Sequence, residues 1–195
     1  LIAFYHATNG DQWKNNTNWC SDKPVSEWYG LTIENGYVTQ LNLAENNLSG
    51  YLPECIGELQ HLTDISLWEN YNLGGKLPAG LFSLENLKSL HIRICAIEGE
   101  ISPDIKQLTK LESLSIGNNK FTGRFPSEIS ELKNLYFLSI DNGDFILGNE
   151  SQPINCNNFT PCEFPKSLCK LTNLKELYAY KNNFYGNSPS GIGQL

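Results

Sequence analysis

The sequence has no methionine, and it has no apolar run near the roughly 18 residues that a membrane-spanning helix needs. Basic residues are scarce: 14 Lys and Arg stand against 21 Asp and Glu, which gives a formal net charge of -7 and a pI near 5.0. Because no stripe of Lys and Arg can neutralise phosphates, we predict no nucleic-acid partner. The chain starts at Leu1, so we expect a removed signal peptide or a fragment of a longer protein.

What the sequence does contain is a repeat of 24 or 25 residues. In one copy, Leu111, Leu114 and Ile116 have the spacing of a short strand with alternating faces, and Asn119 follows where the chain must turn. The turn position recurs as Asn46, Asn70, Cys95, Asn119, Gly143 and Asn182. In the fifth copy Phe145 then takes the next apolar position. A unit this short cannot bury its own apolar row, so the copies must stack into a solenoid.

The shared pattern, L-x-x-L-x-L-x-x-N-x-L-x-G-x-I/L-P, resembles the plant-specific subclass of leucine-rich repeats, which also occurs in bacterial and protist surface proteins. The resemblance implies an α/β solenoid, a right-handed superhelix with a parallel inner β-sheet, short outer strands and 3₁₀ or helical outer turns. It covers residues 38–195 as about six repeats, with a looped insertion near 147–162 and an incomplete last repeat. Residues 1–37 are then an N-terminal cap, made of a short helix and a Trp-rich loop.

Three tryptophans of the cap, Trp13, Trp19 and Trp28, lie within 20 residues of one another. They could form an aromatic platform for a sugar, but we favour a lid over the core that an open solenoid end exposes. Similar caps of secreted plant proteins read C-x-W-x-G-V-x-C. This chain keeps Trp28 and Gly30 but has Ile33 in place of the second cysteine. That departure favours a bacterial surface protein over a plant receptor.

The six cysteines allow three disulfides or none. Disulfides are plausible from Cys156 to either Cys162 or Cys169 at the insertion, and between Cys20 and Cys55 from cap to first repeat. Cys95 occupies the turn position, where we expect a buried, inert thiol. Zinc is the alternative for the insertion cluster, but no His lies there and C-x-x-C never occurs, so we expect no metal. Disulfides would fit a secreted or cell-surface protein in an extracellular or periplasmic compartment.

Stacking places the outward residues of successive inner strands side by side, about 4.8 Å apart. On this concave face we expect one group of neighbours from adjacent repeats, Trp68, His91 and Arg93, and a second group near the insertion. The candidate ligand-binding residues are Trp68, His91, Arg93, Asp141, Tyr136, Phe137, Tyr178 and Tyr180. Exposed rings and Arg are typical of binding hot spots. The alternative is that these rings only pack on neighbouring side-chain stems.

Groups for catalysis are too dispersed to act together. His6 falls in the cap, His61 on an outer turn and His91 on the inner sheet. His91 could form a triad with Asp64 and Ser66, but a flat sheet offers no oxyanion hole or water-excluding pocket. We therefore predict a protein that is not an enzyme and that needs no cofactor.

These features together predict a non-enzymatic extracellular recognition module that binds a protein or peptide on its concave sheet. Because exposed rings can stack on sugars, a glycan-binding adhesin or an inhibitor of a carbohydrate-active enzyme is the first alternative. The sequence stops at GIGQL, in the middle of a repeat. A structural spacer of a larger surface protein is therefore a third interpretation, and self-association through the open C-terminal repeat is a further expectation.

Overall fold

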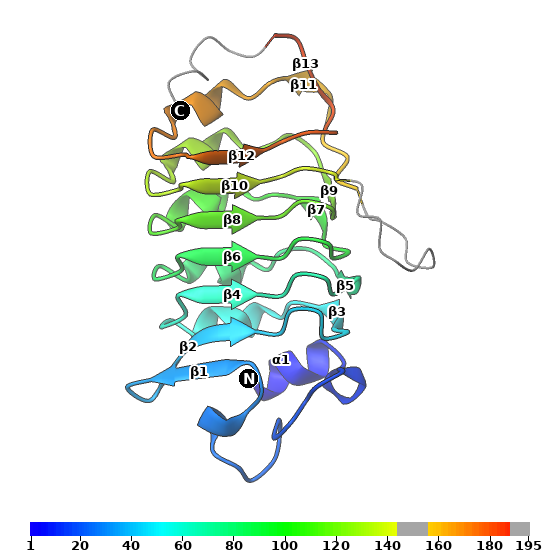
Figure 1. The fold of residues 1–195 in the computed structure, drawn as a ribbon, viewed down its shortest axis with the longest axis vertical. Helices are drawn as coiled ribbons and strands as arrows, with labels where there is room; N and C mark the ends of the chain where they lie inside the picture. Colours follow the sequence, from blue (N-terminus) through cyan, green and yellow to red (C-terminus); the bar gives the residue numbers. More distant parts are fainter. Residues whose placement is uncertain (144–155, 188–195) are drawn as a thin grey trace.

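The protein is a stack of short strands joined by outer turns (Figure 1). The computed structural model describes residues 1–143 and 156–187. Its seven-stranded sheet has the order β1-β2-β4-β6-β8-β10-β12; β1 is antiparallel to β2, and all later neighbours are parallel. The strands are β1 Leu31–Glu34, β2 Tyr37–Asn42, β4 Asp64–Ser66, β6 Ser89–His91, β8 Ser113–Ser115, β10 Phe137–Ser139 and β12 Glu176–Tyr178. The predicted α/β solenoid is confirmed.

The opposite side of the stack carries a row of short 3₁₀ turns. They are η3 Glu54–Glu58, η4 Ala79–Ser83, η5 Pro103–Gln107, η6 Ser127–Glu131 and η7 Lys166–Lys170. Four of them directly follow a proline and the fifth starts with one, because proline fixes φ and its missing N–H is not needed at the start of a helical turn. Between the two faces run three strand pairs: β3 Ser49–Tyr51 with β5 Asn72–Gly74, β7 Glu98–Glu100 with β9 Lys120–Thr122, and β11 Cys162–Glu163 with β13 Phe184–Tyr185.

The core is a set of apolar rows that run along the stack. Leu67, Ile92 and Ile116 are each 0–1% exposed and share one interior row, as predicted. The strand register pairs Leu90 with Ile65 on one side and with Leu114 on the other, which aligns a second row. Each repeat therefore buries its apolar residues only against its neighbours.

Asparagines at the turn position tie each repeat to the one before it. Asn70 donates to the carbonyls of Leu43 and Leu67 at 2.9 and 2.8 Å, and its Oδ1 accepts from the amide of Leu48. In the third repeat, Cys95 takes this place and its Sγ lies 3.3 Å from the carbonyl of Leu67. Cys95 is free and buried, as predicted, and burial raises its pKa to about 12, which disfavours the reactive thiolate.

The turn position of the fifth repeat is Asn157 and not Gly143, so the prediction there was wrong. Asn157 donates to the carbonyl of Ile116 and accepts from the amide of Phe121, both at 3.2 Å. The buried turn needs a side-chain amide, which glycine cannot supply. Phe159 then fills the next apolar position at 1% exposure. The insertion consequently precedes the turn residue and lies within 143–156 instead of 147–162.

Two expectations fall outside the described residues: the placement of Phe145, and the open end of the last repeat at 188–195. The base of the insertion is described, and Asn142 holds it closed. Its Oδ1 accepts from the amide of Asn157 at 2.7 Å, and its Nδ2 donates to the carbonyls of Asn157 and Lys181, both at 2.9 Å. The chain thus leaves and re-enters the stack at one fixed point.

The N-terminal segment contains α1 Ile2–Ala7, η1 Gly10–Gln12 and η2 Val25–Glu27. Trp13, Trp19 and Trp28 are each only 6% exposed, and the ring of Trp19 packs against those of Phe4 and Tyr5. The three indole N–H groups donate to backbone carbonyls of this segment at 2.8–3.1 Å. The rings therefore cover the end of the core, and the alternative of a sugar platform is wrong because they are not available to a ligand.

The predicted disulfides are also wrong. All six cysteines lie in the described part of the chain, and none forms a disulfide. Cys55 and Cys169 sit within outer 3₁₀ turns, whereas Cys20 lies in the cap loop and Cys162 begins β11. The pairs proposed from the sequence, Cys20 with Cys55 and Cys156 with Cys162 or Cys169, are therefore not bonded in this structure. Among the described residues, no helix has the length and apolar character to cross a membrane.

Candidate functional site on the concave face

The concave face is formed by the outward residues of the parallel strands. His91 of β6 pairs with Ser115 of β8, Ser115 with Ser139 of β10, and Ser139 with Tyr178 of β12, as the repeat spacing predicts. Ser115 and Ser139 are only 7% and 3% exposed, although they point outward. Large side chains from neighbouring positions must therefore cover them, so this part of the sheet is not a bare, flat surface.

An ion pair spans the middle of this face. The Nη2 of Arg93 lies 2.9 Å from the Oδ2 of Asp141, two repeats away, and Asp141 is 1% exposed. Gly117 occupies the equivalent position in the repeat between them. A Cβ at Gly117 would lie 2.5 Å from the carbonyl oxygen of Asp141 and 3.2 Å from its Oδ1. The missing side chain leaves room for the pair, while the Oγ of Ser139 donates to Asp141 at 2.6 Å.

Two shallow cavities flank the ion pair. The first, of about 290 Å³, is lined by Trp68, Glu69, His91, Arg93, Ile94, Ser115 and Phe137. The second, of about 360 Å³, is lined by Arg93, Ser115, Phe137, Ser139, Asp141, Gly143, Tyr178 and Tyr180. Because Arg93, Ser115 and Phe137 line both, the cavities lie side by side as one candidate site. We call it the concave trough.

The structure brings most of the predicted residues together. Trp68, His91 and Arg93 line one cavity, as expected, and Asp141, Phe137, Tyr178 and Tyr180 line the other. The ring centre of Phe137 lies 5.7 Å from that of Tyr178 and 6.3 Å from that of His91, which links the two groups. Tyr136 is 42% exposed and lines neither cavity.

Five residues that line the trough were not among the candidates: Glu69, Ile94, Ser115, Ser139 and Gly143. Glu69 lines the first cavity and Gly143 the second. Glu69 directly follows Trp68 in the sequence, and that adjacency was an available signal. Gly143 carried no such signal, because its place depends on where the insertion begins.

The electrostatics of the trough favour neutral or paired groups. Burial lowers the pKa of His91, although the charge of Asp64 acts in the opposite direction, so His91 is neutral at pH 7. Its Nε2 lies 2.7 Å from the Oγ of Ser113, on the neighbouring strand, and not against Ser66 as a triad would require. Partial burial and a hydrogen bond to Asp141 raise the pKa of Tyr180, which stays protonated at neutral pH.

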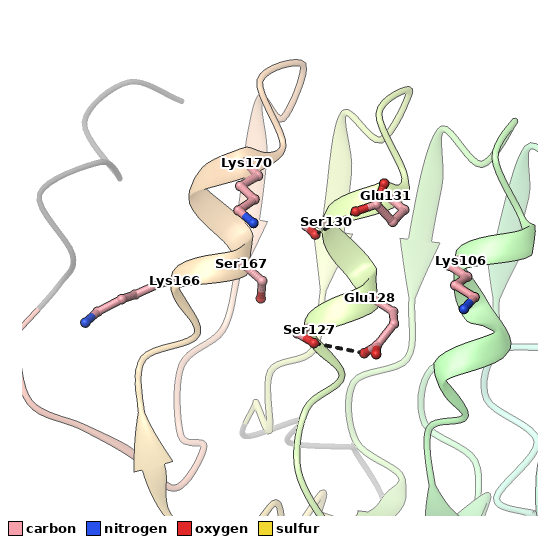
Figure 2. Close-up of a pocket in the computed structure, with 8 residues that line it drawn as sticks. All are labelled: Lys106, Ser127, Glu128, Ser130, Glu131, Lys166, Ser167 and Lys170. Atoms are coloured by element: carbon pink, nitrogen blue, oxygen red, sulfur yellow. Dashed lines mark hydrogen bonds between the residues drawn. The ribbon is translucent and has the colours of Figure 1, made fainter.

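A larger cavity, of about 600 Å³, lies on the opposite side between the 3₁₀ turns (Figure 2). Its lining is Lys106, Ser127, Glu128, Ser130, Glu131, Lys166, Ser167 and Lys170. Lys166 points away from it in Figure 2 and pairs with Glu163 at 3.7 Å. A cavity lined by Lys, Glu and Ser side chains, with no aromatic ring, has little to anchor a ligand. The concave trough is therefore the better candidate site.

The protein has a parallel sheet, an N-terminal segment that covers one end of the stack, and a trough lined by aromatic rings. These are features of solenoid binding scaffolds. Residues 39–195 match the family described as "Leucine-rich repeat region", and the chain belongs to the leucine-rich repeat family. Its repeats are of the plant type.

Solved structures support this assignment. The ectodomain of the Arabidopsis thaliana membrane receptor kinase GASSHO1/SCHENGEN3, in complex with CASPARIAN STRIP INTEGRITY FACTOR 2, has a TM-score of 0.84 at 26% identity. That match covers 99% of this chain and 22% of the other. The plant peptide hormone receptor RGFR1 in complex with RGF2 has a TM-score of 0.63 at 28% identity, over 75% of this chain and 21% of the other.

A polygalacturonase inhibitor of Pyrus communis is 28% identical over 77 residues, which are 38% of this chain and 23% of that protein. The chain thus spans less than a quarter of each of these three relatives. They are plant proteins, so the expectation of a bacterial origin is not supported. By their names, these relatives are receptors and an inhibitor.

Proposed function

We propose that the chain is an extracellular recognition module that binds a peptide, or an extended segment of a protein, along the concave trough. The observation that carries this proposal is the set of aromatic rings that line the two adjacent cavities beside the Arg93–Asp141 pair. Rigid rings give a large contact area at a small cost in conformational entropy, and the pair beneath them holds the floor of the trough in place. Two relatives also support it, one a peptide hormone receptor and one a receptor kinase ectodomain with its bound factor.

The length of the trough suits a short extended segment. Trp68 and Tyr180 occupy equivalent positions in their repeats, and the intervening repeats place Arg93, Gly117 and Asp141 there. Each step between neighbouring repeats is marked by a backbone hydrogen bond, from the amide of Glu69 to the carbonyl of Arg93 at the first step and from the amide of Asn142 to the carbonyl of Tyr180 at the last. Four strand spacings separate the two rings, which is about 19 Å and roughly six extended residues. A ligand of this size can lie across the strands and contact both cavities.

The test is a selection of displayed random peptides on the immobilised chain, followed by Kd measurements on variants. Trp68→Ala and Tyr180→Ala should each weaken selected peptides by about tenfold or more, since truncated hot-spot rings cost about 1–2 kcal/mol. Tyr51→Ala is the matched control, because Tyr51 is 57% exposed on an outer strand. Selected peptides that bind both trough variants as tightly as the wild type contradict the proposal.

A second candidate is inhibition of a carbohydrate-active enzyme, or direct binding of a glycan. It is supported by the similarity to a polygalacturonase inhibitor and by the exposed rings of Tyr178 and Tyr180. Residual polygalacturonase activity, measured with increasing amounts of the chain, tests the first form, and a glycan array tests the second. If the Tyr178→Ala, Tyr180→Ala double variant no longer inhibits the enzyme or no longer binds the glycan, that activity is assigned to the trough.

A further inference from the structure

One end of the trough combines a tryptophan face with carboxylates. Trp68 is partly exposed there, and the cavity beside it is also lined by Glu69, Phe137 and the neutral His91. The carbonyl of Trp68 accepts from the amide of Glu45 at 2.9 Å, so Glu45 stands next to it in the preceding repeat. Rings with an acidic group beside them are the surroundings that proteins use for cations.

Glu45 and Glu69 hold equivalent positions and have the same left-handed backbone, with φ of 55° and 56°. Both act on the hydroxyl of Tyr71, whose pKa is raised to about 12, first by burial and then by the charges of Glu69 and Glu45. Tyr71 donates to the Oε2 of Glu69 at 3.1 Å, which fixes that carboxylate and leaves its charge in place. Glu69 therefore places a carboxylate at this end of the trough, and Glu45 adds negative charge from the preceding repeat.

Within the described residues, no salt bridge involves either carboxylate. The guanidinium of Arg93 pairs with Asp141 at 2.9 Å, and that pair is neutral as a whole. Burial lowers the pKa of His91, so it adds no positive charge at pH 7. The local charge is consequently negative, in a chain whose net charge is already -7.

We propose that the cavity beside Trp68 receives a basic side chain, Arg or Lys, of the bound peptide, an inference that rests on the peptide-binding function proposed above. The apolar stem of such a side chain packs on Trp68 and Phe137, while its charged head lies beside Glu69, and Glu45 adds to the negative potential from the preceding repeat. Complementary charge also selects against acidic peptides. The rings supply the contact area, and the two carboxylates determine which side chain is accepted.

The test is an NMR titration of the ¹⁵N-labelled chain, followed at the indole N–H signals. The chain has four tryptophans, and Trp68 is the one outside the cap, so a Trp68→Phe variant assigns its signal. N-acetyl-arginine amide should shift this signal saturably, and the neutral N-acetyl-norleucine amide should not. Glu69→Gln should weaken the response at least threefold. Glu98→Gln, an exposed acidic residue on an outer strand, should leave it unchanged.

Failure of this inference can be told apart from failure of the peptide-binding proposal. Equal shifts with the arginine and norleucine probes, no shift with either, or no effect of Glu69→Gln would overturn the choice of a basic side chain. The choice of a basic side chain would also be overturned if selected peptides lose affinity in Trp68→Ala but contain neither Arg nor Lys. In that case the trough would remain the binding site. If selected peptides depend on neither Trp68 nor Tyr180, both proposals fall.

Discussion

At the scale of single residues, Asp141 is a charged side chain that is buried on the open face of a sheet. Its burial is tolerated because Arg93 and Ser139 both donate to its carboxylate. A buried carboxylate that loses its cationic partner is left with an uncompensated charge, which costs more than a surface pair contributes. Arg93 is therefore a stabilising residue as well as part of the candidate site, and its removal cannot serve as a clean test of binding.

The Arg93→Ala variant should lower the free energy of unfolding by about 2 kcal/mol, because it leaves Asp141 buried and unpaired while the cavity stays partly open to water. Lys88→Ala is the matched control, since Lys88 pairs with Glu112 at 3.6 Å on an exposed surface and its loss should cost under about 0.5 kcal/mol. Urea unfolding followed by circular dichroism measures both. Equal losses in the two variants would show that the buried pair adds no stability.

At the scale of elements, the strands and turns could be predicted from sequence because each repeats the same few apolar, Asn and Pro positions. The fifth turn could not, since Gly143 stands at the regular spacing and Asn157 does not. Only the hydrogen bonds of Asn157 to Ile116 and Phe121 identify the true turn residue. The ion pair between Arg93 and Asp141 was beyond sequence reasoning for a similar reason, because it joins residues 48 apart that are not in adjacent repeats.

The Asn157→Ala variant should lower the free energy of unfolding by about 1–2 kcal/mol, because it leaves the amide of Phe121 without its side-chain acceptor. It also removes one of two donors to the carbonyl of Ile116, which Asn119 still contacts at 3.1 Å. Asn158→Ala provides the control one residue away, where the side chain is exposed and bonds only to Asn183. Thermal unfolding of the two variants measures the difference. If Asn157→Ala unfolds at the same temperature as Asn158→Ala, another residue closes this turn.

At the scale of the whole molecule, a solenoid has no centre, and its stability is the sum of contacts between neighbouring repeats. The ends are then decisive, because an uncovered end exposes the apolar rows that every inner repeat buries. The three tryptophans that the sequence predicts as a lid, Trp13, Trp19 and Trp28, are buried in the core cluster at the N-terminal end. Trp68, in contrast, is partly exposed and lines the trough. Its position makes it a candidate binding residue, whereas the three buried tryptophans are structural.

Trp19→Ala should therefore lower the free energy of unfolding by about 3–5 kcal/mol, the range for removing a buried large ring. The ring of Trp19 packs against Phe4, Tyr5, Trp13 and Trp28, so its loss loosens the whole lid over the first repeat. Trp68→Ala should cost about 1 kcal/mol or less, because its ring is partly exposed and covers no repeat. Urea unfolding gives both values, and binding of a dye for exposed apolar surface should rise only in Trp19→Ala. If the two variants lose the same stability, the cap does not seal the stack, and the distinction between structural and binding tryptophans fails.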